Sequence, residues 1–221
     1  MPKIDAKATK RGFLITGLAF LMGLVGAGFS APTTAASDGD PGTFIQSLGQ
    51  QAIALLADDT LAPIDRQHAF RELLTDRFDM TSIGRLVMGR HWRQMTEAQR
   101  KLFGPLFEDF VVTTYSRRLA AYSGETLKVG HTRNAGKSLI AVGSEVARAR
   151  GQSVNVDWML RRNKGRWYVI DVVIEGVSMV ITQRSEFATV ISQRGGVDGL
   201  IETLRVRIDV ANADEPEAWL D

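Results

Sequence analysis

Apolar side chains recur three or four positions apart from residue 43 to residue 123, which is the spacing of one face of a helix. Phe44 and Leu48 share such a face at the start, and Ile64 and Phe70 share the next one. The polar stretch Asp58-Asp59-Thr60 separates the two. The pattern predicts helices at 43–57, 63–78, 80–89 and 97–123.

The helix at 97–123 carries its own start and stop signals. Thr96 and Gln99 have the spacing of a capping box, and Gly124 is suited to end the helix. Its apolar stripe is wide and includes Phe107, Phe110, Val111, Tyr115 and Leu119.

The period of the pattern falls to two after residue 125. Short turns containing Gly136, Gly151 or Gly165 separate the alternating runs, which is typical of an antiparallel meander. The predicted strands are 126–133, 138–148, 153–162 and 166–174, and helices at 178–193 and 197–207 follow. We therefore expect an α+β fold with N-terminal helices, a four-stranded antiparallel sheet and C-terminal helices.

The last strand is apolar on both faces and is interrupted only by Asp171. Strict alternation places Trp167, Val169 and Val173 on one face and Tyr168, Ile170, Val172 and Ile174 on the other. Two interpretations remain open: the strand is buried between helical layers, or one of its faces lines an apolar cavity.

Charge divides the chain into a leader and a body. The first 36 residues hold four of the 27 Lys and Arg and one of the 25 Asp and Glu, so the rest has a net charge of about −1. This near-neutral body does not favour a nucleic-acid partner. A basic start, the uncharged run Phe13–Phe29 and Thr34-Ala35-Ala36 predict a cleaved signal peptide at 1–36, with an uncleaved anchor as the alternative.

The body is expected to form one domain. We assign 37–42 to a linker, 43–210 to the domain and 211–221 to an acidic flexible tail.

Little in the sequence points to catalysis or to a cofactor. The chain has no cysteine, and its three histidines lack metal-binding spacing, so we expect neither a metal nor a cofactor. Ser178 is best interpreted as a helix cap, and Gly176 as part of a tight turn before it. Asp171 and Glu175 could act as an acid–base pair, although their spacing across a strand end separates them.

Arginines gather between residues 71 and 100 and include Arg85, Arg90 and Arg93. One interpretation is a solvated helical surface with local ion pairs. The other is a patch that binds an anionic head group or an acidic partner protein.

Several strings resemble one family. Met88–Arg93 and Thr96–Arg100 are similar to the start of the long helix in the Mla-pathway periplasmic phospholipid-binding carriers, also called the MlaC or toluene-tolerance auxiliary family. The segment Gly165–Ser178 resembles the family's G-x-W-x-x-x-D-x-x-x-E-G-V-S hallmark over its full length. In this chain the hallmark places Trp167, Asp171, Glu175, Gly176 and Ser178 at a strand-to-helix corner, where we expect structural roles.

The resemblance implies a periplasmic shuttle without enzymatic activity. It implies phospholipid, or hopanoid as in one subgroup, as the ligand, and as partners an outer-membrane lipoprotein complex and an inner-membrane ABC transport complex. Such a carrier must cover about 30 methylenes, whose exposure to water costs more than about 20 kcal/mol. The resemblance also implies an apolar cavity between the sheet and the helices that holds the acyl chains. Combining this with the helical and strand patterns, we expect the lipid to contact Phe107, Phe110, Val111, Tyr115, Leu119, Ile140, Val142, Trp158, Ile170, Val172 and Ile174.

Two alternatives to lipid carriage follow from the same sequence. A periplasmic adaptor that only docks to membrane complexes would have a filled core and no cavity. An enzyme would need a carboxylate such as Asp171 inside a pocket.

Overall fold

A computed structural model describes residues 39–58, 60–119, 124–148 and 152–213. The predicted signal peptide, the first two residues of the linker and the last eight residues of the predicted tail lie outside this description, as does the junction expected to end the long helix. Residues 35–221 form a compact unit of their own. Its elements are α1 (Pro41–Leu56), α2 (Pro63–Arg77), α3 (Met80–Met88), α4 (His91–Gln94), α5 (Glu97–Leu119), β1 (Thr126–Gly136), β2 (Leu139–Ala147), β3 (Val154–Asn163), β4 (Arg166–Ile174), β5 (Val177–Ser178), α6 (Met179–Gln193) and α7 (Val197–Ala213).

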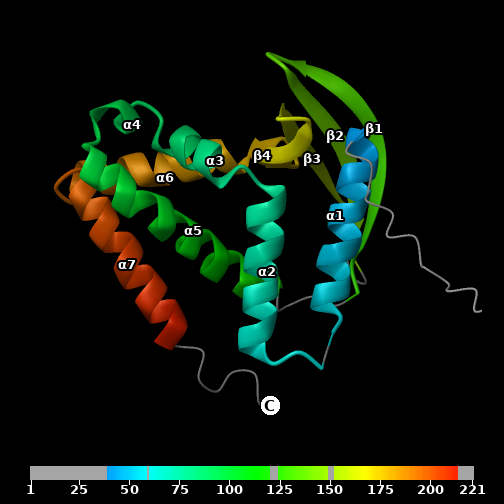
Figure 1. Ribbon diagram of the computed structural model, residues 1–221, viewed down its shortest axis with the longest axis horizontal. Helices are drawn as coiled ribbons and strands as arrows, with labels where there is room; N and C mark the ends of the chain where they lie inside the picture. The colour runs from blue at the N-terminus through cyan, green and yellow to red at the C-terminus, as the bar shows by residue number, and fades with distance from the viewer. Residues whose placement is uncertain (1–38, 59, 120–123, 149–151, 214–221) are drawn as a thin grey trace, which may run out of the picture. The chain divides into compact units, whose positions relative to one another are not determined.

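The strands form one antiparallel sheet in the order β1-β2-β3-β4-β5 (Figure 1). The α+β class and the order of its parts are confirmed. Two short elements were missed: the four-residue α4 and the two-residue β5, which pairs only with the end of β4. Neither is long enough to show a period in its side chains.

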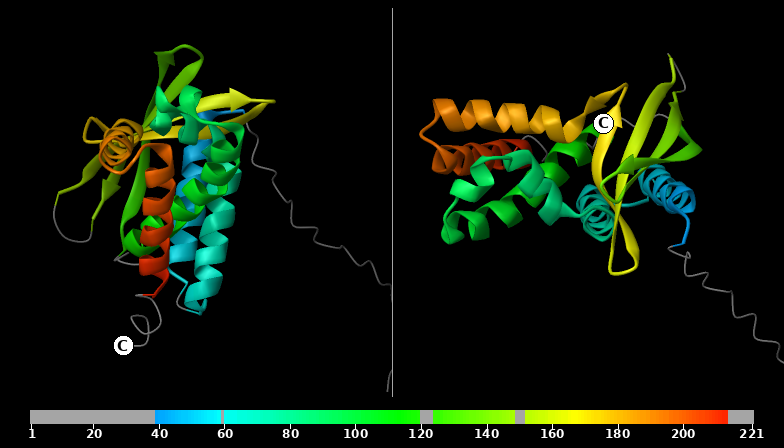
Figure 2. Two further views of the ribbon diagram at one scale, coloured as in Figure 1. Left: turned by 90° about the vertical axis from the view of Figure 1, so that its left-hand side faces the viewer. Right: turned by 90° about the horizontal axis from the view of Figure 1, so that it is seen from above.

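Two main hydrophobic clusters hold the unit together. In the first, α1 packs against one face of the sheet through Phe44, Ile45 and Leu48. In the second, α3, α5, α6 and α7 pack on one another around Phe107 and Phe187, whose rings meet edge to face at 6.2 Å. Figure 2 shows α6 running away from the sheet at the end of β4, so this helical cluster extends beyond the sheet.

The start of α5 follows its sequence signals, whereas the start of α2 does not. Thr96 Oγ1 accepts the N–H of Gln99, and the Gln99 side chain accepts the N–H of Thr96, which confirms the capping box. Ile64 is 56% exposed, however, so its expected place on the buried face of α2 was wrong. It lies in the first turn of α2, ahead of the buried Phe70 and Leu74.

Strand β4 contains a bulge that changes which side chains share a face. Its register against β3 shifts by one residue at Ile170. An extra residue reverses the side on which all later residues point. Val172 therefore joins Trp167 and Val169 in the cluster under α1, and its predicted grouping with Ile170 was wrong.

Asp79 connects the helices to the edge of the sheet. Its backbone N–H donates to the carbonyl of Val169 in β4 at 3.0 Å. Its carboxylate accepts the N–H of Ser82 at 2.9 Å, which caps α3, and pairs with the Arg161 guanidinium of β3 at 2.7 Å. Burial raises the pKa of this carboxyl, but the hydrogen bonds from Ser82 and Arg161 outweigh burial and hold the pKa below its usual value.

We predict that Asp79→Asn lowers the free energy of unfolding by about 1 kcal/mol at pH 7, because the amide still caps α3 but no longer pairs with Arg161. The folded-state pKa is lowered, so the stability from the carboxylate is present above its unfolded pKa of about 3.9 and is lost as the pH falls through the folded value. Urea unfolding at pH 7 and at acid pH measures this. A difference between the two proteins that stays constant down to acid pH would contradict the assignment.

Candidate functional site

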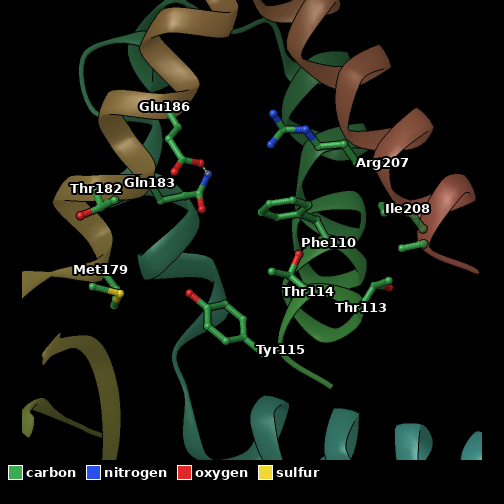
Figure 3. A pocket seen from close by; sticks show the side chains of 11 residues that line it. Phe110, Thr113, Thr114, Tyr115, Met179, Thr182, Gln183, Glu186, Arg207 and Ile208 are labelled. Atoms are coloured by element: carbon green, nitrogen blue, oxygen red, sulfur yellow. Dashed lines mark hydrogen bonds between the residues drawn. The ribbon is translucent and has the colours of Figure 1, made fainter. Parts of the chain in front are cut away.

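A cavity of about 350 Å³ lies among the last three long helices (Figure 3). Apolar side chains from each helix reach it: Phe110 and Tyr115 from α5, Met179 from α6 and Ile208 from α7. Its remaining lining residues are Thr113, Thr114, Thr182, Gln183, Glu186, Arg207 and Ala211. The volume is within the range of small-molecule pockets, which is about 300–1,000 Å³.

Charged groups lie together at one end of this cavity. Figure 3 shows Glu186 of α6 and Arg207 of α7 pointing toward each other across it, while Tyr115 and Met179 lie toward the other end. Glu186 accepts a hydrogen bond from the Gln183 amide at 3.2 Å. The cavity therefore offers an apolar part and a polar rim, an arrangement suited to an amphipathic molecule.

The predicted lipid contacts on α5 divide into three groups. Phe110 and Tyr115 line the cavity. Phe107 is buried in the helical cluster behind it, and Val111 packs between that cluster and α2. The side chain of Leu119 lies outside the described residues.

This cavity lies among three helices and not between the sheet and the helices, where it was expected, so the predicted contacts on the strands are not brought to it. Ile140, Val142, Trp158 and Val172 pack under α1. Ile170 is buried at the bulge, and Ile174 is 36% exposed at the end of β4. The bulge explains why Val172 was misplaced, because strict alternation had put its side chain on the other face of β4.

Sequence reasoning missed the contributions of α6 and α7 to the cavity. Met179, Gln183 and Glu186 are spaced four and three residues apart, so the helical period could have grouped them. Ile208 and Ala211 lie past the predicted end of the last helix at 207, although α7 continues to Ala213. The acidic composition after residue 208 obscured this extension.

The hallmark residues build the corner between β4 and α6. The Asp171 carboxylate accepts the hydroxyl of Ser178 at 2.5 Å and the backbone N–H of Val180 at 3.0 Å. Ser178 is the N-cap of α6, and its Oγ accepts the N–H of Ile181 at 3.0 Å. These contacts hold the first turn of α6 against the end of β4.

Glu175 and Gly176 shape the same corner, whereas Trp167, which was expected there, lies near the start of β4. Glu175 and Gly176 have φ angles of 49° and 80°, which form the tight turn between β4 and β5. The Glu175 carboxylate accepts the backbone N–H of Asn155 from β3 at 2.5 Å. Trp167 packs in the cluster under α1, with the Arg162 guanidinium 5.5 Å from its ring centroid.

This geometry leaves Asp171 no free role in acid–base chemistry, because its oxygens already accept two backbone N–H groups and a hydroxyl. It also lies outside the lining of the α5–α7 cavity. No group of His, Asp or Glu in the described residues could hold a metal ion. The predicted patch residues lie away from the lining of this cavity: Arg85 is on α3, Arg93 is on α4 and Arg90 is in the turn between them.

Comparison with known proteins agrees with the fold and the hallmark. The model of the MlaC protein family matches residues 46–206, which is most of the chain. The chain belongs to the MlaC family. Within the described residues, no helix of this family member is long and apolar enough to cross a membrane.

Two individual proteins are similar to this MlaC family member. The intermembrane phospholipid transport system binding protein MlaC of Haemophilus influenzae is 23% identical over 126 residues, which cover 55% of this chain and 58% of that protein. The alignment thus spans little more than half of that relative. A phospholipid-binding protein from Ralstonia solanacearum, solved in complex with a phospholipid, has a TM-score of 0.68 and 26% identity over 78% of this chain and 99% of its own.

We predict that Asp171 and Ser178 act as one unit in stabilising the corner. Asp171→Asn and Ser178→Ala should each lower the free energy of unfolding by about 1–3 kcal/mol, because each leaves polar groups of the corner without a partner. The double variant should lose at least about 0.5 kcal/mol less than the sum of the two, measured by urea unfolding. Strict additivity would contradict this coupling.

Proposed function

We propose that this chain is a periplasmic phospholipid carrier that holds acyl chains in the α5–α7 cavity. The observation that carries the proposal is a cavity with an apolar part and a charged rim in a member of the MlaC family. The phospholipid complex of the similar Ralstonia protein supports the choice of ligand. The leader predicted at 1–36 supports the periplasm as the compartment.

The cavity of about 350 Å³ is near the lower end of the range of small-molecule pockets, and a phospholipid is larger than most such ligands. We infer that the helices separate when the acyl chains are loaded.

Helix α7 is the wall best suited to move. Its first half is anchored in the core by Leu200 and Leu204, which are fully buried. Its second half carries the exposed Val206 and Val210 and has fewer buried contacts to break. We infer that the part of α7 after Leu204 moves away from α5 and α6 to admit the chains.

The rim fits a charged head group. Arg207 can pair with a phosphate, and its position at the rim leaves the head group near water. In this proposal the carrier exchanges phospholipid, or a hopanoid bearing a polar head, between an outer-membrane lipoprotein complex and an inner-membrane ABC complex. The intermembrane transport system named for the Haemophilus relative supports this role.

Native mass spectrometry of residues 35–221, purified from a periplasm without detergent, tests the proposal. We expect a lipid adduct at about one per chain, and extraction of the adduct identifies the cargo. A protein that stays free of lipid after incubation with phospholipid vesicles would instead favour an adaptor without a cargo site.

We predict that Thr114→Trp lowers the amount of co-purifying lipid at least about tenfold, because the indole occupies the cavity that Thr114 lines. Thr75→Trp is the matched control: it makes the same change on an exposed position of α2 outside the cavity lining. Lipid is extracted from both folded variants and quantified as phosphorus. Equal lipid content in the two would contradict the placement of the site.

A further inference from the structure

Five arginines gather where α3, α4 and the start of α5 meet α6, the region at the labels α3 and α4 in Figure 1. We call this surface the arginine corner; its members are Arg85, Arg90, Arg93, Arg100 and Arg184. Arg184 belongs to it because its Nε donates to the carbonyl of Leu86 at 2.7 Å. These arginines come from separate segments, so the fold brings them together.

Acidic residues do not neutralise the corner. The sequence from residue 80 to residue 96 contains no Asp or Glu. Glu97 lies next to it and pairs with Lys101 at 3.0 Å, and Asp198 accepts the side-chain amide of Gln99 at 2.9 Å. Within the described part of the chain, Arg85, Arg90 and Arg93 are exposed and form no ion pair.

An indole and an exposed leucine lie among the arginines. The guanidinium groups of Arg85 and Arg100 lie 5.5 and 5.4 Å from the ring centroid of Trp92, and Arg100 donates to the Trp92 carbonyl. Leu86, whose carbonyl accepts from Arg184, is 36% exposed. Arginine, tryptophan and exposed leucine together are typical of surfaces that lie at a membrane–water interface.

We propose that the arginine corner docks this protein on anionic phospholipid bilayers. Guanidinium groups bind lipid phosphates, while Leu86 contacts the acyl boundary, and an acidic protein surface offers no such boundary. The whole body has a net charge of about −1, so it has no general attraction to an anionic surface, and attraction through this corner orients the protein. Binding through so few cations is weak and reversible, and it requires no bound cargo.

Vesicle sedimentation with residues 35–221 tests this surface without the basic leader. The probes are vesicles of phosphatidylglycerol with phosphatidylcholine and vesicles of phosphatidylcholine alone. We expect binding to the anionic vesicles only, and weaker binding when ionic strength rises from about 0.01 M to about 0.15 M. Replacing Arg85, Arg90 and Arg93 by Gln should lower binding on the order of 100-fold.

The control variant removes the same number of positive charges from the sheet and its turns. Lys128→Gln, Lys137→Gln and Lys164→Gln together take away three exposed cations outside the corner and should leave binding within about twofold. Arg90→Gln with Arg93→Gln serves as a second variant that spares the stacking of Arg85 on Trp92.

The proposal would be overturned by an equal loss of binding in the lysine variant, by unchanged binding in both arginine variants, or by no binding of the wild type. The last result would assign the corner to an acidic protein instead. Lipid content, measured separately, reports on the carrier function.

Discussion

The carboxylate of Asp171 determines where the helical half of the molecule lies. It accepts hydrogen bonds from Ser178 and Val180 and so fixes the first turn of α6 to the end of the sheet. Because α6 then runs away from the sheet, α5 and α7 pack on α6 beyond the edge of β4 (Figure 2). The cavity forms between these three helices. The polar side chains of the hallmark thus position the helices that enclose the site, although Asp171 and Ser178 do not line it.

The fold could be predicted from sequence because its signals are local. The change of period after residue 125, the turn glycines Gly136 and Gly165 and the capping box each act within a few residues, and each is present in the structure. The candidate site could be predicted only in part. Phe110 and Tyr115 were found because α5 is regular, whereas Val172 was misplaced by one extra residue in β4. A bulge leaves the composition of a strand unchanged while it reverses the faces, so alternation alone does not reveal it.

Helix α6 links the two surfaces that the account assigns. Gln183 lines the cavity, and the next residue, Arg184, contacts α3 in the arginine corner. Adjacent residues on a helix point about 100° apart, so one helix serves both surfaces without steric conflict. Docking on a bilayer would then take place on a wall of the cavity. The wall opposite, formed by the second half of α7, carries exposed valines and remains free to move.

The central claim is that acyl chains occupy the space among α5, α6 and α7, and photo-crosslinking tests it most directly. A phospholipid with a diazirine in its acyl chain is loaded into residues 35–221, irradiated and mapped by peptide mass spectrometry. The account predicts adducts on the segments that contain Phe110, Tyr115, Met179 and Ile208. Adducts confined to the strands under α1, around Val142, Trp158 and Val172, would contradict it.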